Sequence, residues 1–397
     1  MSHSDSERQR AVKQRSCHSR TAGRIPSLDG FRAIAIGLVL LAHAAHTLPP
    51  EFEAPKKLLQ VGGLGVSVFF VISGYLITTL MVREEARAGS VDLTEFYLRR
   101  AFRILPPFYT YLTVIILLSV LGIFVLAPQV ILNGALFITN YKHYWTPNDG
   151  PNYWFVGHFW TLSLEEQFYL LWPAIFCIAG RRRALPAALV LIGLVQACRV
   201  ATHYFDAQSR GQIDMMLHTS LDSLMTGCVM SLAETNRAYH RMVETLRSST
   251  AAIIALFIVL GPPIAPYFLG QYYAYYLPTI GRLLGLGSIA VLILWAIHNE
   301  GSWAGRVLNS RPFVYVGVLS YSLYLWQQLF LSPVNHSWLG QFPQNLLLTF
   351  VAAQLSYTLV ETPFLRMRGR VEEHVRRIRS KKGTPHLQPE VAATTEK

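Results

Sequence analysis

Long stretches without any charged residue constrain this chain more than any other feature. Asp, Glu, Lys and Arg are absent from residues 33–50, 61–82, 104–141, 248–281 and 312–360. Apolar runs of this length match the roughly 20 residues that a helix needs to cross about 30 Å of hydrocarbon. Charged residues make up only 15% of the 397-residue chain, against about 25% in soluble domains. The sequence therefore predicts an all-α integral membrane protein that crosses the bilayer several times.

We expect about ten transmembrane helices, whose boundaries follow the apolar segments. They cover residues 33–48, 62–82, 106–127, 159–179, 184–204, 218–233, 249–269, 279–297, 312–331 and 345–361. Together they form one predicted membrane domain over residues 25–368. Residues 1–24 have no apolar core like that of a signal peptide, so we expect a disordered basic cytoplasmic tail there. Residues 369–397 predict a second basic cytoplasmic tail.

The positive charges are distributed very unevenly between the two sides of the predicted bundle. With both termini placed in the cytoplasm, 29 of the 35 Lys and Arg residues lie on the cytoplasmic side and 4 on the other side. The remaining two, Arg199 and Arg282, fall within predicted spans. This asymmetry is the positive-inside pattern. The net charge of +12 therefore indicates membrane topology and contact with the lipid bilayer, and it does not indicate a nucleic-acid partner.

The first candidate site lies on the first span. Arg32 and His43 are eleven residues apart, so a helix places them within about 20° of one face and about 16 Å apart along its axis. An ionisable residue inside a membrane marks a functional site by default, and imidazole accepts a proton near neutral pH. We therefore interpret His43 as a candidate general base, with a hydrogen-bonded packing histidine as the alternative.

The second candidate site lies in the segment 158–173. Entering the membrane from the outer side, this helix brings Glu165 close to the depth of His43. A carboxylate there can orient or polarise the imidazole, and the hydroxyl of Ser163 is a possible nucleophile. Solvation at the membrane interface is the alternative for Glu165 and Glu166. Ser163, Trp160 and Tyr169, all from this segment, are also candidates for substrate binding.

The third candidate site is the arginine-rich stretch between the second and third spans. On a helix, either Arg99 or Arg100 shares a face with Arg103, and guanidinium forks bind phosphate well. Spacing alone favours positive-inside topology over phosphate binding. The sequence contains neither a P-loop nor a dinucleotide-binding fingerprint, and the four cysteines have neither metal-site nor disulfide-framework spacing.

Other polar residues within predicted spans are candidates for lining a substrate cavity. Asp222 and Tyr324 are two of them. For Tyr324, together with Tyr321 and Trp326, a seam of interhelical hydrogen bonds is the alternative. The intramembrane ionisable residues also suit a transporter or flippase for a glycoside or lipid-linked sugar, although no paired broken helices indicate internal repeats. A non-catalytic membrane scaffold is a third possibility, and it requires none of Arg32, His43 and Glu165.

Several motifs, taken together and in order, resemble those of acyltransferase family 3. They are Arg32 and His43, the run GVSVFFVISGYLI at residues 65–77, the loop ending RILPPFY, the Ser-x-Glu-x-x-Phe-Tyr pattern from Ser163 to Tyr169, the segment GVLSYSLYLW at residues 317–326, and Glu361-Thr-Pro. The similarity extends over residues 24–368. In two places the chain differs from many members, which have a histidine near Gln327 and an arginine near Ser220.

The resemblance implies a ten-helix enzyme of the bacterial inner or plasma membrane that decorates envelope glycans, nodulation factors or macrolides. Its expected reaction moves an acyl group, acetyl being the expected one, from cytoplasmic acyl-coenzyme A to a hydroxyl. His43 would be the catalytic base, Arg32 would assist at the donor, Arg100 and Arg103 would hold coenzyme phosphates, and Glu165 would belong to the catalytic or acceptor site. We expect no permanently bound cofactor or metal. Direct transfer and a covalent acyl intermediate both remain open, as does the oligomeric state.

Overall fold

The computed structural model describes residues 25–48, 61–145, 150–261, 280–335 and 337–381. Within these ranges the regular elements are all helices, as the apolar runs predict. The N-terminal tail predicted for residues 1–24, and the part of the C-terminal tail from residue 382 onward, lie outside the described residues.

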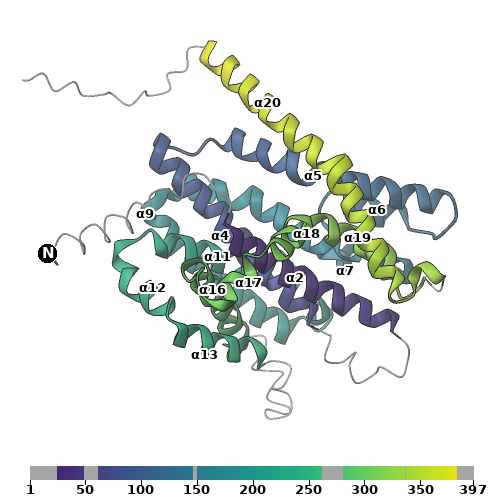
Figure 1. The fold of residues 1–397 in the computed structure, drawn as a ribbon, viewed down its shortest axis with the longest axis horizontal. Coiled ribbons are helices and arrows are strands. Elements are labelled where there is room, and N and C mark those ends of the chain that lie inside the picture. The colour runs from purple at the N-terminus through teal and green to yellow at the C-terminus, as the bar shows by residue number, and fades with distance from the viewer. Residues whose placement is uncertain (1–24, 49–60, 146–149, 262–279, 336, 382–397) are drawn as a thin grey trace, which may run out of the picture.

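Figure 1 shows how the longer helices are arranged. They are α2 (Pro26–Ala44), α4 (Gly62–Ala88), α5 (Leu93–Val120), α6 (Pro128–Ala135), α9 (Phe159–Phe205), α11 (Asp222–Glu234), α12 (His240–Leu246), α13 (Ser249–Leu260), α16 (Arg282–His298), α17 (Trp303–Leu308), α18 (Arg311–Phe330), α19 (Gln344–Ser356) and α20 (Thr362–Lys381). A single π-helical turn, Tyr357–Glu361, joins α19 to α20. The short helices α7 (Lys142–Trp145), α8 (Trp154–Gly157) and α10 (Leu217–Ser220) lie in the connections before α9 and α11.

Helix α2 runs through the middle of the molecule and packs against α4 and α18 (Figure 1). The close crossing of α4 and α11 depends on two glycines. A Cβ atom at Gly74 of α4 would overlap the carbonyl oxygen of Leu224, and one at Gly227 of α11 would overlap the backbone of Val71. Small residues at such crossings let helix backbones approach closely inside a membrane. The two glycines therefore let α11 pack closely against α4, which in turn packs against α2.

The longest helix, α9, contains a sharp break. Gly180 has φ 68° and ψ 161°, so the chain leaves the helical conformation there and resumes it in the following residues. Positive φ is readily adopted by glycine, which has no Cβ. The break falls between the spans predicted for residues 159–179 and 184–204. The structure therefore divides this helix where the sequence predicts a loop.

Among the residues that the structure describes, four helices are long and apolar enough to cross a membrane. They are Pro26–Thr47, Gly62–Ala88, Leu93–Val120 and Trp154–Phe205. A fifth candidate is the pair Arg237–Leu246 and Ser249–Leu260, which is bent by 71°. Helix α16 is apolar but has only 17 residues, and α18 carries buried Gln327 and Gln328. The structure thus describes an all-helical multi-pass membrane protein with four or five candidate spans, and ten spans remain a prediction.

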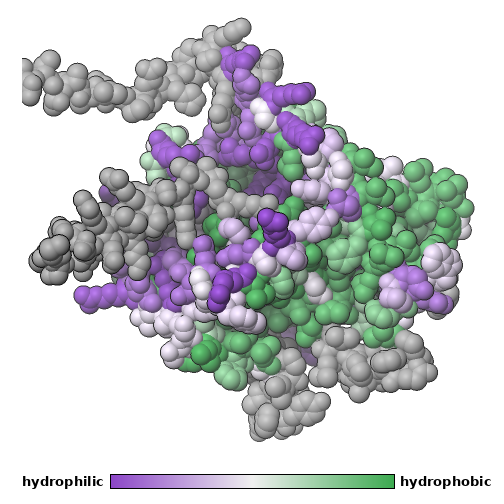
Figure 2. All heavy atoms as spheres, viewed as in Figure 1, coloured by the Kyte–Doolittle hydropathy of each residue, from purple (hydrophilic) through white to green (hydrophobic). Residues whose placement is uncertain are grey.

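One broad face of the molecule is apolar. Figure 2 shows hydrophobic side chains gathered on the side where α5, α6 and α19 lie, and hydrophilic ones gathered toward α20. The apolar face includes exposed Leu117, Val120, Leu132 and Leu347. An exposed apolar surface of this kind is suited to contact with lipid tails.

Candidate active site

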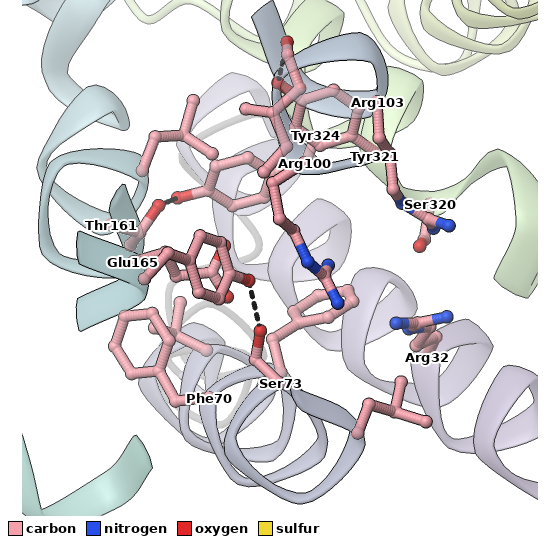
Figure 3. Close-up of a pocket in the computed structure, with 16 residues that line it drawn as sticks. Arg32, Phe70, Ser73, Arg100, Arg103, Thr161, Glu165, Ser320, Tyr321 and Tyr324 are labelled. Carbon is pink, nitrogen blue, oxygen red and sulfur yellow. Dashed lines mark hydrogen bonds between the residues drawn. The ribbon is translucent and has the colours of Figure 1, made fainter. Parts of the chain in front are cut away.

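A cavity of about 100 Å³ lies between α2, α4, α5, α9 and α18, and we call it the arginine cavity. Figure 3 shows the side chains of Arg32, Arg100 and Arg103 converging on it from α2 and α5. Glu165 and Tyr169 of α9 and Tyr321 and Tyr324 of α18 complete its polar lining. Residues far apart in the sequence therefore form one site, which is rich in positive charge.

The start of α5 sets which of its arginines face this cavity. Asp92 caps the helix by accepting a hydrogen bond from the Glu95 amide at 3.1 Å. The helical register then directs Arg100 and Arg103 to the cavity. Arg99 lies elsewhere, because its guanidinium binds Glu84 at 2.9 Å and Glu95 at 3.3 Å. Three arginines were predicted to hold phosphate. One of them, Arg99, instead forms ion pairs with Glu84 and Glu95.

The other charged groups of the arginine cavity are held by neighbours. Arg32 Nη1 donates to Asp29 Oδ1 at 3.4 Å, and the Arg100 guanidinium lies 5.1 Å from the centre of the Tyr169 ring. The Tyr169 hydroxyl is hydrogen-bonded to Ser73, as Figure 3 shows. The Glu165 carboxylate interacts electrostatically with all three cavity arginines, including Arg103. The cavity therefore presents several guanidinium groups in preset positions around one carboxylate.

A second cavity, of about 450 Å³, contains His43, and we call it the histidine cavity. The residues that line it are Val39, His43, Gly62, Gly63, Val66, Lys142, Gly150, Tyr153, Trp154, Gly157, His158, Trp160, Met215, Tyr324 and Gln328. Its lining is mainly aromatic and small, with two imidazoles, one from α2 and one from the residue that precedes α9. A lining of this kind, with few polar groups, is typical of binding sites for small ligands.

Both imidazoles of the histidine cavity are held by glutamines of α18. His43 Nδ1 lies 2.6 Å from Gln327 Oε1, and His158 Nδ1 lies 2.7 Å from Gln328 Oε1. The His43 ring also packs edge-on against Trp154, with 5.3 Å between ring centroids. The orienting group predicted for His43 was Glu165, but the hydrogen bond to its Nδ1 comes from Gln327.

The structure distributes the sequence-predicted residues over both cavities. Arg32 and His43 lie on α2 but line different cavities, and Glu165 shares the one with Arg32. Tyr169 lines the arginine cavity and Trp160 the histidine cavity. Tyr324 lines both. The predicted meeting of His43 and Glu165 in one pocket is therefore not seen, although the two cavities adjoin.

Two predicted substrate-binding residues lie outside both cavities. The Ser163 hydroxyl is fully buried, donates to the Phe159 carbonyl at 2.9 Å and accepts from the Thr139 amide at 3.2 Å. Asp222 is also fully buried, and its carboxylate accepts from Arg282 Nε at 2.8 Å. Both side chains make hydrogen bonds that hold helices and loops together, and neither of them lines one of the two cavities.

Sequence reasoning missed three residues of the histidine cavity and its immediate surroundings. They are His158, Gln327 and Gln328. A signal for the glutamines was present, because they end the polar and aromatic stripe from Ser320 to Gln328 on α18. The sequence did not show which imidazoles they would meet. Within the described part of the chain, no group of three or more His, Cys, Asp and Glu residues is arranged to hold a metal ion.

The fold and the two cavities define a class of protein: a multi-pass helical membrane protein with a cationic cavity beside an imidazole-containing one. The chain belongs to the acyltransferase 3 family, whose acyltransferase domain matches residues 25–361. The resemblance inferred from the motifs is thereby confirmed.

Curated relatives share this domain at modest identity. The chain is 28% identical over 375 residues to the O-acetyltransferase OatA of Staphylococcus aureus strain NCTC 8325, covering 87% of this chain and 58% of that protein. It is 24% identical over 371 residues to the peptidoglycan O-acetyltransferase OatA of Listeria monocytogenes, covering 85% and 55%. The chain thus spans a little over half the length of these relatives. No solved structure matches it significantly.

Proposed function

We propose that this protein is a membrane O-acyltransferase that moves an acetyl group from acyl-coenzyme A to a hydroxyl group of a carbohydrate. One observation carries the proposal. The arginine cavity, suited to a phosphorylated donor, adjoins the histidine cavity, which holds a candidate base, and the two share Val66 and Tyr324 in their linings. A donor bound in the first cavity can therefore present its thioester toward the second.

The donor would be held by the arginine cavity. Coenzyme A carries phosphates at one end and a thioester at the end of a long flexible arm. Guanidinium forks bind phosphate in a bidentate manner, and Arg32, Arg100 and Arg103 converge on one space. Glu165 would act here as a positioning residue, because its carboxylate interacts with these arginines and not with His43.

The chemical step would take place at His43. Because His43 donates its Nδ1 proton to Gln327 Oε1, Nε2 carries the lone pair that a general base needs. His43 would take the proton from the acceptor hydroxyl while the hydroxyl oxygen attacks the thioester carbonyl. The carbon–sulfur bond then breaks, an ester forms, and the proton passes from His43 to the leaving thiolate. The products are the acylated acceptor and free coenzyme A.

The acceptor would occupy the histidine cavity. The rings of Tyr153, Trp154 and Trp160 line it, and flat aromatic rings pack well against the apolar faces of sugars. The relative from Listeria monocytogenes is named for acting on peptidoglycan. We therefore propose a cell-envelope glycan as the acceptor, in preference to a macrolide-type molecule.

We further propose ten spans with both termini in the cytoplasm of a bacterial cell, so that the arginine cavity opens toward the coenzyme pool. The 29-to-4 distribution of Lys and Arg supports this orientation. Single cysteines at Ser90 in the α4–α5 connection and at Ser337 in the α18–α19 connection would test it. A membrane-impermeant thiol reagent applied to intact cells should label only the second position.

The function is tested with membranes that contain the protein, labelled acetyl-coenzyme A and a panel of hydroxylated acceptors including peptidoglycan fragments. Wild type should transfer label and release free coenzyme A. His43→Ala should lose about 10²-fold or more of the transfer rate. His46→Ala is the matched control, because this histidine lies in the 3₁₀ turn Ala45–Thr47 that directly follows α2 and is outside both cavity linings.

Three outcomes would count against the proposal or its mechanism. Equal transfer by wild type and His43→Ala would remove His43 from the mechanism. Export of an unmodified glycoside by proteoliposomes, with no label transferred to any acceptor, would replace the enzyme with a transporter. Label retained on acid-quenched protein would replace direct transfer with a covalent acyl intermediate.

A further inference from the structure

Two residues separate the arginine cavity from the histidine cavity. Val66 of α4 and Tyr324 of α18 are the residues that line both. The phosphate-binding arginines therefore lie on one side of this pair and His43 on the other. A thioester that reaches His43 from a donor held by the arginines has to pass between Val66 and Tyr324.

Tyr324 is held in place by its hydroxyl group. Its oxygen lies 2.7 Å from Thr161 Oγ1 and donates to the His158 carbonyl at 3.2 Å. Thr161 Oγ1 lies 3.0 Å from the same carbonyl. Figure 3 shows the Tyr324 ring reaching from α18 to Thr161 of α9. The position of the ring is thus fixed by hydrogen bonds from its hydroxyl group to Thr161 and to the His158 carbonyl.

Aromatic neighbours pack against the same ring. The Tyr324 ring lies edge-on to Phe69, with centroids 6.5 Å apart, and to His158, with centroids 5.4 Å apart. The side chain is only 8% exposed. A buried, hydrogen-bonded ring in both linings is therefore placed, together with Val66, to limit what passes between the two cavities.

We propose that Tyr324 is the partition between the donor and acceptor cavities, and that together with Val66 it sets the size of the acyl group that is transferred. This inference rests on the proposed acyltransferase function. An acetyl group passes the partition, whereas a branched acyl group is excluded by the Tyr324 ring. The same ring keeps water away from the thioester, so that coenzyme A is released only when an acceptor hydroxyl takes the acyl group.

The experiment compares acetyl- and isobutyryl-coenzyme A as donors for wild type, Tyr324→Ala, Tyr324→Phe and Val66→Ala. Label transferred to the acceptor is measured with acceptor present, and free coenzyme A is measured with and without acceptor. Tyr315→Ala is the matched control, because Tyr315 lies on the same helix, is 53% exposed and hydrogen-bonds Gln354 away from both cavities.

Val66→Ala and Tyr324→Ala should raise the isobutyryl-to-acetyl transfer ratio by about tenfold or more, since a few carbon atoms in a fitted pocket change selectivity by 10- to 200-fold. Tyr324→Ala should also release coenzyme A without acceptor, as water attacks the thioester and gives the free acid and the thiol. Tyr324→Phe, which keeps the ring but loses its hydrogen bonds, should release less coenzyme A without acceptor than Tyr324→Ala does. Tyr315→Ala should behave as wild type.

An unchanged donor ratio in Val66→Ala and Tyr324→Ala, with acetyl transfer intact, would overturn the partition and leave the proposed function standing. Loss of all transfer by wild type with every donor would instead overturn the proposed function. If Tyr324→Ala does not accumulate in the membrane, the proposal is tested with Val66→Ala and with Val66→Phe, whose larger side chain should narrow the space between the two cavities. Val66→Phe should slow acetyl transfer, and equal rates for both Val66 variants would refute the proposal.

Discussion

Gln327 of α18 is hydrogen-bonded to His43 of α2, with 2.6 Å between Gln327 Oε1 and His43 Nδ1. The two residues are 284 positions apart in the chain, and Gln327 is fully buried. A hydrogen bond to one ring nitrogen fixes both the tautomer and the direction of the other nitrogen. The group that orients the candidate base is therefore a neutral amide from another helix.

This relationship predicts the effect of removing the amide. Gln327→Leu should lower kcat by about 10- to 100-fold, as removing the hydrogen-bond partner that orients a metal-bound histidine typically does. The KM for acetyl-coenzyme A should stay unchanged, because Gln327 lies outside the lining of the arginine cavity. Steady-state kinetics in membranes would measure both constants. Gln354→Leu, at a partly exposed amide of α19, is the control, and a kcat reduced equally in both variants would contradict this role.

The arginines of α5 make a second prediction, in which two neighbours behave differently. Arg100→Gln and Arg103→Gln should raise the KM for acetyl-coenzyme A by about 10- to 100-fold, the effect of losing a hydrogen bond between charged groups of about 1.5–3 kcal/mol. Arg99→Gln should change it little, because Arg99 binds Glu84 and Glu95 instead.

Acetyl-coenzyme A that lacks the 3′-phosphate tests whether Arg100 or Arg103 binds that phosphate. Where an arginine binds that phosphate, its variant should lose less affinity for the dephosphorylated donor than for the complete one. Equal KM increases in Arg99→Gln and Arg100→Gln would show that general positive charge, and not the cavity, governs donor binding.

The contrast between Arg99 and Arg100 shows what the sequence could and could not predict. Uncharged apolar runs depend only on local composition, so the helices and even the break at Gly180 were predictable. The spacing of the arginines was also visible, but it allowed either Arg99 or Arg100 to face the site. The choice depends on Glu84 and Glu95, whose positions follow from the α4–α5 connection.

The partner of His43 was harder to predict for a related reason. Helical rise gave Glu165 and His43 similar depths, but depth alone does not fix the rotation of a helix about its axis. Rotation is set by close packing, such as that of Gly317 of α18 against the backbone of Asp29 of α2. This contact places Gln327 beside His43, while Glu165 faces the arginines across the cavity.

Close packing of helices gives a third prediction. Gly227→Val should strongly destabilise the protein, because its Cβ atom would overlap the Val71 carbonyl oxygen of α4. Overpacking of this kind costs about 1–3 kcal/mol and often more. Thermal unfolding in detergent should show a lower Tm. Gly37→Ala of α2, where an added Cβ meets no atom within 4 Å, should keep or raise the Tm, and equal losses in both variants would refute the packing argument.

The ion pair between Asp222 and Arg282 gives the last prediction. Asp222 is fully buried and accepts from Arg282 Nε at 2.8 Å and from Arg282 Nη2 at 3.0 Å. Such a two-point pair joins α11 to α16 with strong geometric preference. Asp222→Ala should cost about 3–5 kcal/mol, because it leaves a buried guanidinium with reduced compensation. Arg282→Met should be similarly costly, since it leaves the Asp222 carboxylate buried.

The double variant measures how much the contact between Asp222 and Arg282 itself contributes to stability. Asp222→Ala with Arg282→Met should be much less destabilised than the sum of the single variants, because neither charge is then left without its partner. Glu373→Ala removes the exposed ion pair with Arg377 on α20 and should change stability by less than about 1 kcal/mol. Additive losses in the double variant, measured by unfolding in detergent, would show that Asp222 and Arg282 stabilise the bundle separately and that their contact contributes nothing of its own.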